Sequence, residues 1–382
     1  MHNSVKLFFI TKAIRSFTFS TIAIVSPFYL SELGLNGIEI GFALFLSLLS
    51  TTIFVYLFGK INFNYKGRTV FLSFLTLIGL AIMIIFYNNS IGFIVGVIFG
   101  GISLTGRDLS AFQPIEQYTM SYYIEDQSEK NIAFSLYDFS SYIASTIGAV
   151  YLTIFAKLPF IDLFSIIFIL VVIESNVYFV LKFPKHVLKK KTEDKDGIYA
   201  GHIRTMSFLF SLDALGGSLV ATSMLSLWFL EVYHISLSTA GFIFSIVSVT
   251  TAISILVSSK IQNNLGLIKT MVYTHLISNG FLIFMPIIHN LYWSEALLYL
   301  RQTTSQMDVP ARGSFINTFY PKDVRIAANT SFTSARSASQ MPGPILGTSL
   351  LSIFPSSMIF LAGGIKVSYD LLLYWKYRWF KK

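Results

Sequence analysis

Residues 26–61 read SPFYLSELGLNGIEIGFALFLSLLSTTIFVYLFGKI, and residues 226–261 read SLWFLEVYHISLSTAGFIFSIVSVTTAISILVSSKI. Aligned without a gap, the two stretches share eight of 36 positions, whereas so biased a composition predicts roughly three identities by chance. The identities are Ser26/Ser226, Leu30/Leu230, Gly41/Gly241, Phe42/Phe242, Thr51/Thr251, Ile53/Ile253, Lys60/Lys260 and Ile61/Ile261. The repeat distance is half the chain, so we expect two parallel halves of about six helices each.

The composition is that of a membrane protein. Hydrophobic residues make up 54% of the chain and charged residues 12%, whereas soluble domains carry about a quarter charged residues. The apolar residues form runs of about 20, the length that crosses the hydrocarbon core as a helix. The ~10-residue alternating segments typical of a β-barrel are not visible. We therefore predict an all-α membrane protein with twelve transmembrane helices in two pseudo-symmetric six-helix bundles.

Metal and catalytic chemistry have no visible basis in the sequence. The chain has no cysteine, and none of its six histidines shows metal-ligand spacing with another. No paired His/Asp or nucleophile arrangement is visible either, so we predict no metal, no cofactor and no enzymatic activity. Lys12 and Arg15 interrupt the first apolar run, which indicates a retained helix rather than a cleaved signal.

The breaks between apolar runs carry turn residues or charges. The predicted spans are 5–30, 38–59, 69–88, 91–119, 130–156, 160–182, 203–230, 238–259, 268–288, 291–318, 326–353 and 356–378. We assign 1–182 to the N-terminal bundle and 203–382 to the C-terminal bundle. The stretch 183–202 mixes Lys with acidic residues and has no apolar period, which predicts a partly disordered cytoplasmic linker.

Basic residues sort to one side of the predicted membrane. With the N-terminus inside, the inward loops, the linker and the C-terminal tail carry the Lys and Arg, and the outward loops carry only Lys157. This pattern predicts a multi-pass plasma-membrane protein with both termini cytoplasmic. The net charge of +9 is then a signal of topology, and we predict no nucleic-acid partner.

Ionisable residues lie inside the predicted spans, where each costs about 2.5–3.5 kcal/mol near the bilayer midplane. They are Arg15, Arg107, Asp108, Asp138, Glu174, Asp213, Arg301, Asp308, Arg336, Lys366 and Asp370. Two interpretations stay open for each: a role in a wet cavity, or structural pairing between helices. Lys366 and Asp370, four residues apart, are expected to satisfy each other, with Glu174 as a possible neighbour.

Polar residues form stripes on three spans. The tenth span carries Arg301, Ser305, Asp308 and Arg312 on one helical face. The fifth and eleventh spans carry stripes that superimpose at an offset of 198: Asn131/Asn329, Ser135/Thr333, Asp138/Arg336 and Tyr142/Gln340. Asp138 and Arg336 would then be equivalent positions of opposite charge on the two sides of a cavity. One could bind protons or cations while the other holds an anion.

Helix breakers interrupt the tenth and eleventh spans. Residues 341–347 read MPGPILG, where proline removes backbone hydrogen bonds and small residues allow close packing. Pro310 and Pro114 mark corresponding inner parts of the tenth and fourth spans. These breaks serve either packing alone or hinges for alternating access. Arg312, near the inner end of its helix, suits an anchor or a gate.

Several motifs resemble the major facilitator superfamily. Residues 26–30, 33–35 and 40–41 look like that family's first helix, outer loop and start of the second helix. Residues 59–68 read GKINFNYKGR, similar to its Gly-x-x-x-Asp-Arg-x-Gly-Arg loop with one extra residue and Asn64 nearest the missing Asp. Residues 106–108 look like the Arg-bearing fourth helix of proton-coupled members. Residues 307–312, with Asn329, Arg336 and 343–347, are similar to prokaryotic permeases labelled as drug or sugar efflux type.

The resemblance implies that the first, fourth, seventh and tenth helices line a cavity between the halves. The second, fifth, eighth and eleventh would flank it, and the third, sixth, ninth and twelfth would face outward. The expected roles follow from this placement. Substrate-cavity residues are Arg15, Arg107, Arg301, Arg336, Gln340 and Tyr142, proton-coupling residues are Asp138 and Asp213, and gate or hinge residues are Asp308, Pro310, Arg312, Gly343, Pro344 and Gly347.

The sequence thus predicts a monomeric secondary transporter in the lipid bilayer that moves a small solute by alternating access. Several cavity arginines suit an organic anion or a polyhydroxyl compound, and the cavity aspartates suit proton coupling. A drug:proton antiporter for apolar cations is an alternative within transport. A membrane sensor on a transporter fold is an alternative of another class, although the longest loop of about 20 residues leaves little room for a signalling segment.

Overall fold

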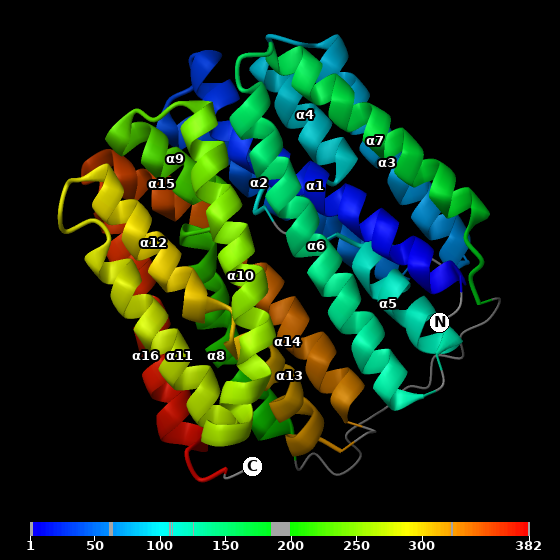
Figure 1. Cartoon of the computed structure of the whole chain (residues 1–382), viewed down its shortest axis with the longest axis vertical. Coiled ribbons are helices and arrows are strands. Elements are labelled where there is room, and N and C mark those ends of the chain that lie inside the picture. Colours follow the sequence, from blue (N-terminus) through cyan, green and yellow to red (C-terminus); the bar gives the residue numbers. More distant parts are fainter. Residues whose placement is uncertain are drawn as a thin grey trace. The chain divides into compact units, whose positions relative to one another are not determined.

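The computed structural model describes residues 3–60, 64–106, 108, 110–124, 126–184, 199–321 and 324–380. Every regular element within these ranges is a helix (Figure 1). The helices are α1 (Asn3–Glu32), α2 (Gly37–Lys60), α3 (Tyr65–Ile85), α4 (Ser90–Gly100), α5 (Phe112–Tyr123), α6 (Gln127–Phe155), α7 (Phe160–Val180), α8 (Ala200–Leu219), α9 (Thr222–Tyr233), α10 (Leu237–Leu265), α11 (Leu267–Phe284), α12 (Leu291–Ser305), α13 (Asp308–Phe319), α14 (Arg325–Gln340), α15 (Gly343–Ile353) and α16 (Ser357–Tyr377).

The sixteen described helices build the twelve predicted spans, because four spans each consist of two helices. The divided spans are the fourth (α4 and α5), the seventh (α8 and α9), the tenth (α12 and α13) and the eleventh (α14 and α15). Each of the other eight spans is one continuous helix. The predicted all-helical architecture of twelve transmembrane spans is confirmed.

The fourth and tenth spans break at corresponding places. Between α4 and α5, Gly101 and Gly106 have φ values of +58° and +79°, a conformation that glycine adopts without steric penalty. Pro114 and Pro310 are each the third residue of the helix that follows the break. The first four N–H groups of a helix need no intrahelical partner, so proline is tolerated there. The proline position is thus shared, whereas the break itself is longer in the fourth span (101–111) than in the tenth (306–307).

Eight described helical stretches are long and apolar enough to cross a membrane, and they contain every span except the fourth, fifth, tenth and eleventh. The fourth, tenth and eleventh spans are absent from this set because each is divided into helices shorter than 18 residues, and α4 is itself apolar. The fourth and fifth spans of one half correspond to the tenth and eleventh of the other, so the same pairs of spans depart from the single long apolar helix in both halves.

The described chain packs as two compact units. Unit 1 contains residues 1–188 and 222–248, and unit 2 contains 189–221 and 249–382. Within unit 1, Ser226 on α9 donates to the backbone oxygen of Ile24 at 2.9 Å, and Ser238 on α10 donates to that of Thr153 at 2.8 Å. The predicted linker falls mostly outside the described residues, because 185–198 are not among them.

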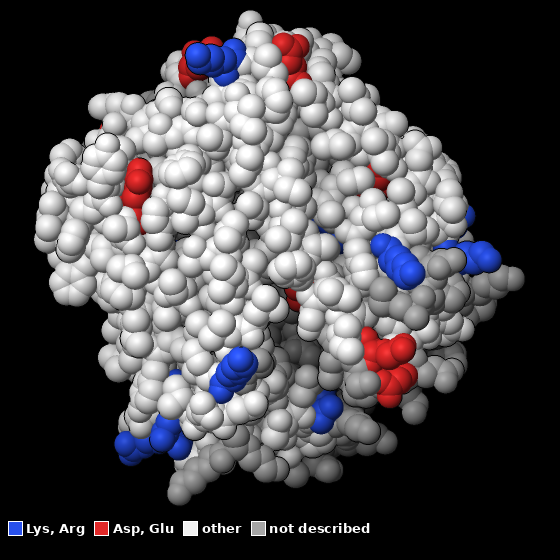
Figure 2. All heavy atoms as spheres, in the orientation of Figure 1, with Lys and Arg blue, Asp and Glu red and all other residues white. Residues whose placement is uncertain are grey.

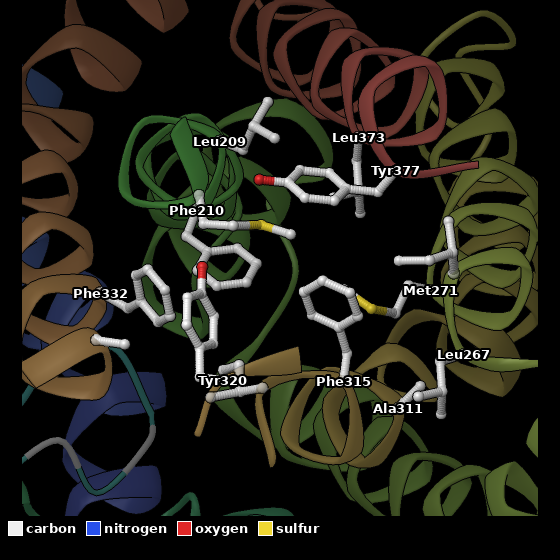
Figure 3. Packing of buried hydrophobic residues seen from close by; sticks show 14 of the residues in the cluster. Leu209, Phe210, Leu267, Met271, Ala311, Phe315, Tyr320, Phe332, Leu373 and Tyr377 are labelled. Atoms are coloured by element: carbon white, nitrogen blue, oxygen red, sulfur yellow. The ribbon is translucent and has the colours of Figure 1, made fainter. Parts of the chain in front are cut away.

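Each unit has an apolar core of buried hydrophobic residues. In unit 1, Phe8, Phe58, Phe112 and Tyr178 belong to one buried cluster. In unit 2, the rings of Phe210, Tyr320 and Phe332 pack together, with Phe210 and Phe332 edge to face at 5.2 Å (Figure 3). On the face drawn in Figure 2, charged side chains are sparse and uncharged surface predominates. Few charged groups on this face would therefore have to lie against lipid.

Candidate functional site

A network of buried charges lies in unit 1 and is called here the Arg15 cluster. Arg15 on α1 is 1% exposed and bonds three carboxylates: Nε to Asp108 at 2.7 Å, Nη2 to Glu116 at 2.6 Å, and Nη1 to Glu174 at 2.9 Å. Lys12, one turn earlier on α1, bonds Asp108 at 2.9 Å. The loop before α5, together with α5 and α7, brings these carboxylates to one cation.

Aromatic side chains fix the geometry of the Arg15 cluster. The guanidinium carbon of Arg15 lies 4.7 Å from the ring centre of Phe112, whose other neighbour is the stacked ring of Tyr178 at 5.4 Å. Tyr178 donates its hydroxyl proton to Glu116 at 2.6 Å, and Tyr137 donates to the same carboxylate. Buried rings exclude water and strengthen each polar contact, so the cluster is held rigidly.

A second network, the Asp213 cluster, lies in unit 2. Asp213 on α8 accepts from Lys366 at 2.7 Å and from Arg336 at 3.0 Å, and Arg312 approaches it at 3.5 Å. Arg312 also pairs with Asp308 at 3.2 Å. The side chains of Arg312 and Arg336 are 17% and 24% exposed. The centre of this network is an anion, and part of its cationic shell reaches water.

The Asp213 cluster continues through a histidine on α11. His275 bonds Asp370 through Nδ1 at 2.8 Å, and its Nε2 lies 3.3 Å from Lys366. Asn279 donates to Asp370 at 2.8 Å. The predicted Lys366–Asp370 pair is therefore wrong. Lys366 pairs with Asp213 on α8, and Asp370 pairs with His275 on α11. The suggested neighbour Glu174 belongs to the Arg15 cluster instead.

The two clusters have corresponding positions of opposite charge. At the offset of 198 that superimposes the polar stripes, Arg15 on α1 falls on Asp213 on α8. α5 and α13 are each 12 residues long and align at an offset of 196. The inverted pairs are Arg15/Asp213, Glu116/Arg312 and Asp138/Arg336. The contact between Arg15 and Glu116 in unit 1 thus recurs in unit 2 with its signs exchanged.

Several predicted site residues come together and others do not. The structure gathers Asp213, Asp308, Arg312 and Arg336 in one cluster, and it places Arg15 in the other. Arg301 on α12 is buried and donates to Gln302 at 3.2 Å, apart from both clusters.

The remaining predicted polar residues lie at less buried positions. Asp138 on α6 is exposed, and within the described ranges no cation lies at ion-pair distance from it. Tyr142 on α6 and Gln340 at the end of α14 are half-buried. Arg107 lies outside the described residues.

The predicted hinge sequence does break its helix. α14 ends at Gln340 and α15 begins at Gly343, with Pro344 in its first turn. Gly343 and Gly347 are buried, and a Cβ atom on Gly343 would meet the side chain of Ser218 at the end of α8. The glycine is needed here because α15 approaches α8 so closely.

Three acidic or basic members of the clusters are not among the site or pairing residues predicted from the sequence: Lys12, Glu116 and His275. Lys12 lies three residues before Arg15, on the same helical face, and this spacing could have identified it. Glu116 could have been found by extending the offset of about 198 to the fourth span. No comparable signal marks His275. In the described part of the chain, no group of three or more His, Asp or Glu side chains is arranged to hold a metal ion.

Known proteins resemble the chain in sequence pattern and in fold. The family model for the Major Facilitator Superfamily matches residues 8–305. No curated protein matches the chain. Among solved structures, an autoinhibited POT family peptide transporter is 13% identical with a TM-score of 0.78, covering 100% of this chain and 98% of that one. The nucleoside transporter NupG is 13% identical with a TM-score of 0.70, covering 99% and 98%.

A third solved structure extends the comparison to another transported class. The human organic anion transporter MFSD10 (TETRAN) is 11% identical with a TM-score of 0.70, and the match covers 98% of this chain and 100% of that one. At such low identity these likenesses show the fold alone. The fold and the family match agree. The chain belongs to the Major Facilitator Superfamily: it is a multi-pass membrane transporter of small molecules, not an enzyme, built as two pseudo-symmetric six-helix bundles.

Proposed function

We propose that the chain is a proton-coupled secondary transporter that moves a small organic anion or polyhydroxyl compound by alternating access. The proposal depends on Arg336, which lies on the polar helix α14. Its side chain is 24% exposed, and its guanidinium lies 3.0 Å from the carboxylate of Asp213. A guanidinium has five N–H donors in a fork that matches carboxylate and phosphate oxygens. Arg336 is therefore oriented by the protein and still able to bind a ligand.

The helix that carries Arg336 supports a water-filled pathway. α14 reads RIAANTSFTSARSASQ and exposes Asn329, Thr330, Thr333 and Ser334. A face so rich in amide and hydroxyl groups is poorly matched to hydrocarbon, so such faces normally line protein or water. The corresponding helix of the other half, α6, exposes Ser135 and Asp138. We infer that each face contacts the solute in its own half, with Arg301, Gln340 and Tyr142 as further contacts.

Two aspartates are the proposed coupling sites. Asp138 is exposed and can exchange protons with water without breaking an ion pair. Asp213 is buried among Lys366, Arg336 and Arg312, so its protonation would release Arg336. A solute anion could then take the place of the Asp213 carboxylate on Arg336. This exchange would link proton binding to anion binding through one guanidinium.

Alternating access needs hinges and a contact that can open. The break between α14 and α15 at Gly343 and Pro344, and the break before Pro310, provide places where a span can bend. The side-chain bonds from Ser226 and Ser238 to backbone oxygens are few and easily exchanged for bonds to water. We propose that they separate during the cycle, while Asp308, Arg312 and Gly347 guide the bending.

Cellular placement follows the charge asymmetry of the loops. We propose that the protein is a monomer in the plasma membrane. We place both termini in the cytoplasm, because Lys and Arg gather on one side of the predicted topology. The resemblance to drug and sugar efflux permeases favours export.

The test is Asp138→Asn in reconstituted vesicles. Small organic anions, sugars and cationic drugs are first screened for raising the unfolding temperature of the purified protein, which identifies a ligand of the folded state. We expect Asp138→Asn to abolish transport of that ligand driven by a pH gradient while leaving unfolding unchanged. Glu129→Gln, an exposed carboxylate on the same helix, is the matched control. Unchanged pH-driven transport by Asp138→Asn would remove Asp138 from the mechanism.

A further inference from the structure

The Arg15 cluster contains more acidic than basic side chains. Its buried cations are Lys12 and Arg15, and its buried carboxyl groups are those of Asp108, Glu116 and Glu174. All five residues are at most 6% exposed. No other described Lys or Arg of unit 1 is buried. If every group were ionised, these five described residues would carry three negative and two positive charges away from water.

An unpaired carboxylate in such surroundings is too costly to persist. A buried ion without a partner lacks both hydration and a counterion, so it becomes neutral by taking up a proton. The described charges of the Arg15 cluster balance with one bound proton. The hydrogen-bond donors then decide which carboxyl group holds it.

Two of the carboxyl groups have the donors that an ionised form needs. Asp108 accepts from Lys12 at 2.9 Å and from Arg15 at 2.7 Å, with Ser110 as a third donor. Several donors on one carboxylate stabilise its charged form. Asp108 is therefore ionised.

Glu116 is surrounded by donors on both oxygens. Its Oε1 accepts from Thr11 at 2.7 Å and from Tyr178 at 2.6 Å, and its Oε2 accepts from Arg15 at 2.6 Å. The hydroxyl of Tyr137 also donates to Oε2. If Glu116 were protonated, its oxygens would have fewer lone pairs to accept the hydrogen bonds from these donors. Glu116 is therefore ionised as well.

Glu174 has fewer hydrogen-bond donors to stabilise an ionised carboxylate than Asp108 or Glu116. Arg15 Nη1 donates to its Oε1 at 2.9 Å, and the hydroxyl of Tyr178 lies at 3.4 Å. That hydroxyl has one proton, which goes to Glu116 at the shorter distance of 2.6 Å. Among the described residues, none donates to Oε2 of Glu174, so a proton on this oxygen meets no competing hydrogen.

The other helix packed on α7 brings no charge to Glu174. The buried hydroxyl groups of α3, on Thr69, Ser73 and Thr76, each bond a backbone oxygen, and that of Thr76 also bonds Gly100 at the end of α4. Lys66 at the start of α3 is exposed and bonds the backbone oxygen of Phe179. Among the described residues, Arg15 is the one cation at ion-pair distance from Glu174, and it is shared with two other carboxylates.

We propose that Glu174 is a proton-binding site and is neutral at physiological pH, while Asp108 and Glu116 are ionised. This deepens the proposed function, on which its use in transport rests, because it gives the N-terminal unit a sealed place for a coupled proton. Arg15 lies on the first span, and Glu174 lies on the sixth. Any motion that shortens their 2.9 Å contact favours release of the proton, and any motion that lengthens it favours uptake.

The experiment is infrared spectroscopy of the purified protein in lipid vesicles, which detects the C=O stretch of protonated carboxyl groups. We expect Glu174→Gln to remove one carboxylic-acid band that is present in the unmodified protein at neutral pH. Asp162→Asn, which alters an exposed carboxylate on the same helix, should leave that band intact. Glu174→Asp should move the band rather than remove it, and this variant serves if Glu174→Gln folds poorly.

The unfolding temperature gives a second, independent reading. Because glutamine resembles a neutral glutamic acid, Glu174→Gln should unfold at the same temperature as the unmodified protein, whereas Glu116→Gln should unfold several degrees lower. A carboxylic-acid band that survives Glu174→Gln overturns the proposal. A band that disappears with this variant supports the proton site even if pH gradients drive no transport, and that second result would refute proton coupling alone.

Discussion

The Arg15 and Asp213 clusters are built on corresponding helices with their central charges exchanged. In unit 1 a buried cation holds three carboxyl groups, and in unit 2 a buried anion holds Lys366, Arg312 and Arg336. The two shells differ in their contact with water. Glu116 and Glu174 are sealed, whereas Arg312 and Arg336 are 17% and 24% exposed.

This difference separates two tasks that one duplicated fold can perform. A sealed cluster must balance its charges internally, since burial of an unpaired ion costs several kcal/mol, and a proton is the smallest available balancing ion. A cluster that reaches water can leave a cation partly unpaired, because hydration replaces a missing partner. In the functions proposed above, the sealed Arg15 cluster holds a proton on Glu174, and the Asp213 cluster presents Arg336 to an anion.

The largest expected effect comes from removing each central charge. Arg15→Met leaves three buried carboxyl groups with Lys12 alone and should destabilise the protein by about 3–5 kcal/mol. Asp213→Asn should cost about 1–3 kcal/mol, because Arg312 retains Asp308, Arg336 reaches water and the buried Lys366 keeps His275 Nε2 at 3.3 Å. The measurement is denaturant or thermal unfolding in detergent.

Lys157, an exposed cation outside both clusters, provides the control. Lys157→Met removes an exposed cation and should change the free energy of unfolding by no more than about 0.5 kcal/mol. Equal losses for Arg15→Met and Asp213→Asn would show that the two clusters are equally dry, which contradicts their different assignments.

An intermediate effect is expected at the close contacts between corresponding helices. Gly148 on α6 faces Thr21 and the backbone oxygen of Phe17 on α1, and Gly343 faces the side chain of Ser218 on α8. Alanine at either position should destabilise the protein by about 1–3 kcal/mol through overpacking. Unfolding temperatures of the two variants measure this loss.

The second-site variants sharpen this test. Ser218→Gly should restore most of the stability of Gly343→Ala, because the two nearest obstructing atoms, Oγ and Cβ, belong to that side chain and the backbone carbon of Ser218 lies farther away at 3.3 Å. Thr21→Ala should not restore Gly148→Ala fully, because the Phe17 oxygen would remain 3.1 Å from the new Cβ atom. Full rescue in both units, or in neither, would disprove the assigned contacts.

The smallest effect concerns one serine pair in each unit, at different positions along the corresponding helix pairs α1/α6 and α8/α14. Ser16 bonds Ser141 at 2.7 Å between α1 and α6, and Ser207 bonds Ser331 at 2.9 Å between α8 and α14. Such bonds in membrane proteins contribute about 0.6 kcal/mol on average. Ser16→Ala and Ser207→Ala should each lower stability by about that amount, measured by double-mutant cycles with the partner serine. A coupling several times larger in one unit alone would break the correspondence.

Much of the fold could be predicted because each signal is local. A run of about 20 apolar residues must form a helix in lipid, where backbone groups have no other partners. The prolines and glycines at 341–347 interrupt a helix for reasons confined to their own backbone, and the break between α14 and α15 confirms this expectation. The stripe offset of 198 also identified one inverted pair, Asp138 and Arg336.

The partners within the clusters could not be read in this way. Lys366 and Asp370 lie on one helical face, yet each finds a partner on another helix, Asp213 and His275. Spacing along a helix limits which face a side chain occupies. It does not determine which neighbouring helix supplies the competing charge, and in a dry interior the better-placed neighbour prevails.

The sequence by itself determined the class of protein, the number of spans and the duplication, because hydropathy and helix breaking act over a few neighbouring residues. Only the tertiary structure decided that Arg15 is sealed by three carboxyl groups and that Arg336 reaches water. Burial and ion pairing are set by helices far apart in the chain, and their packing fixes which charges must be balanced internally.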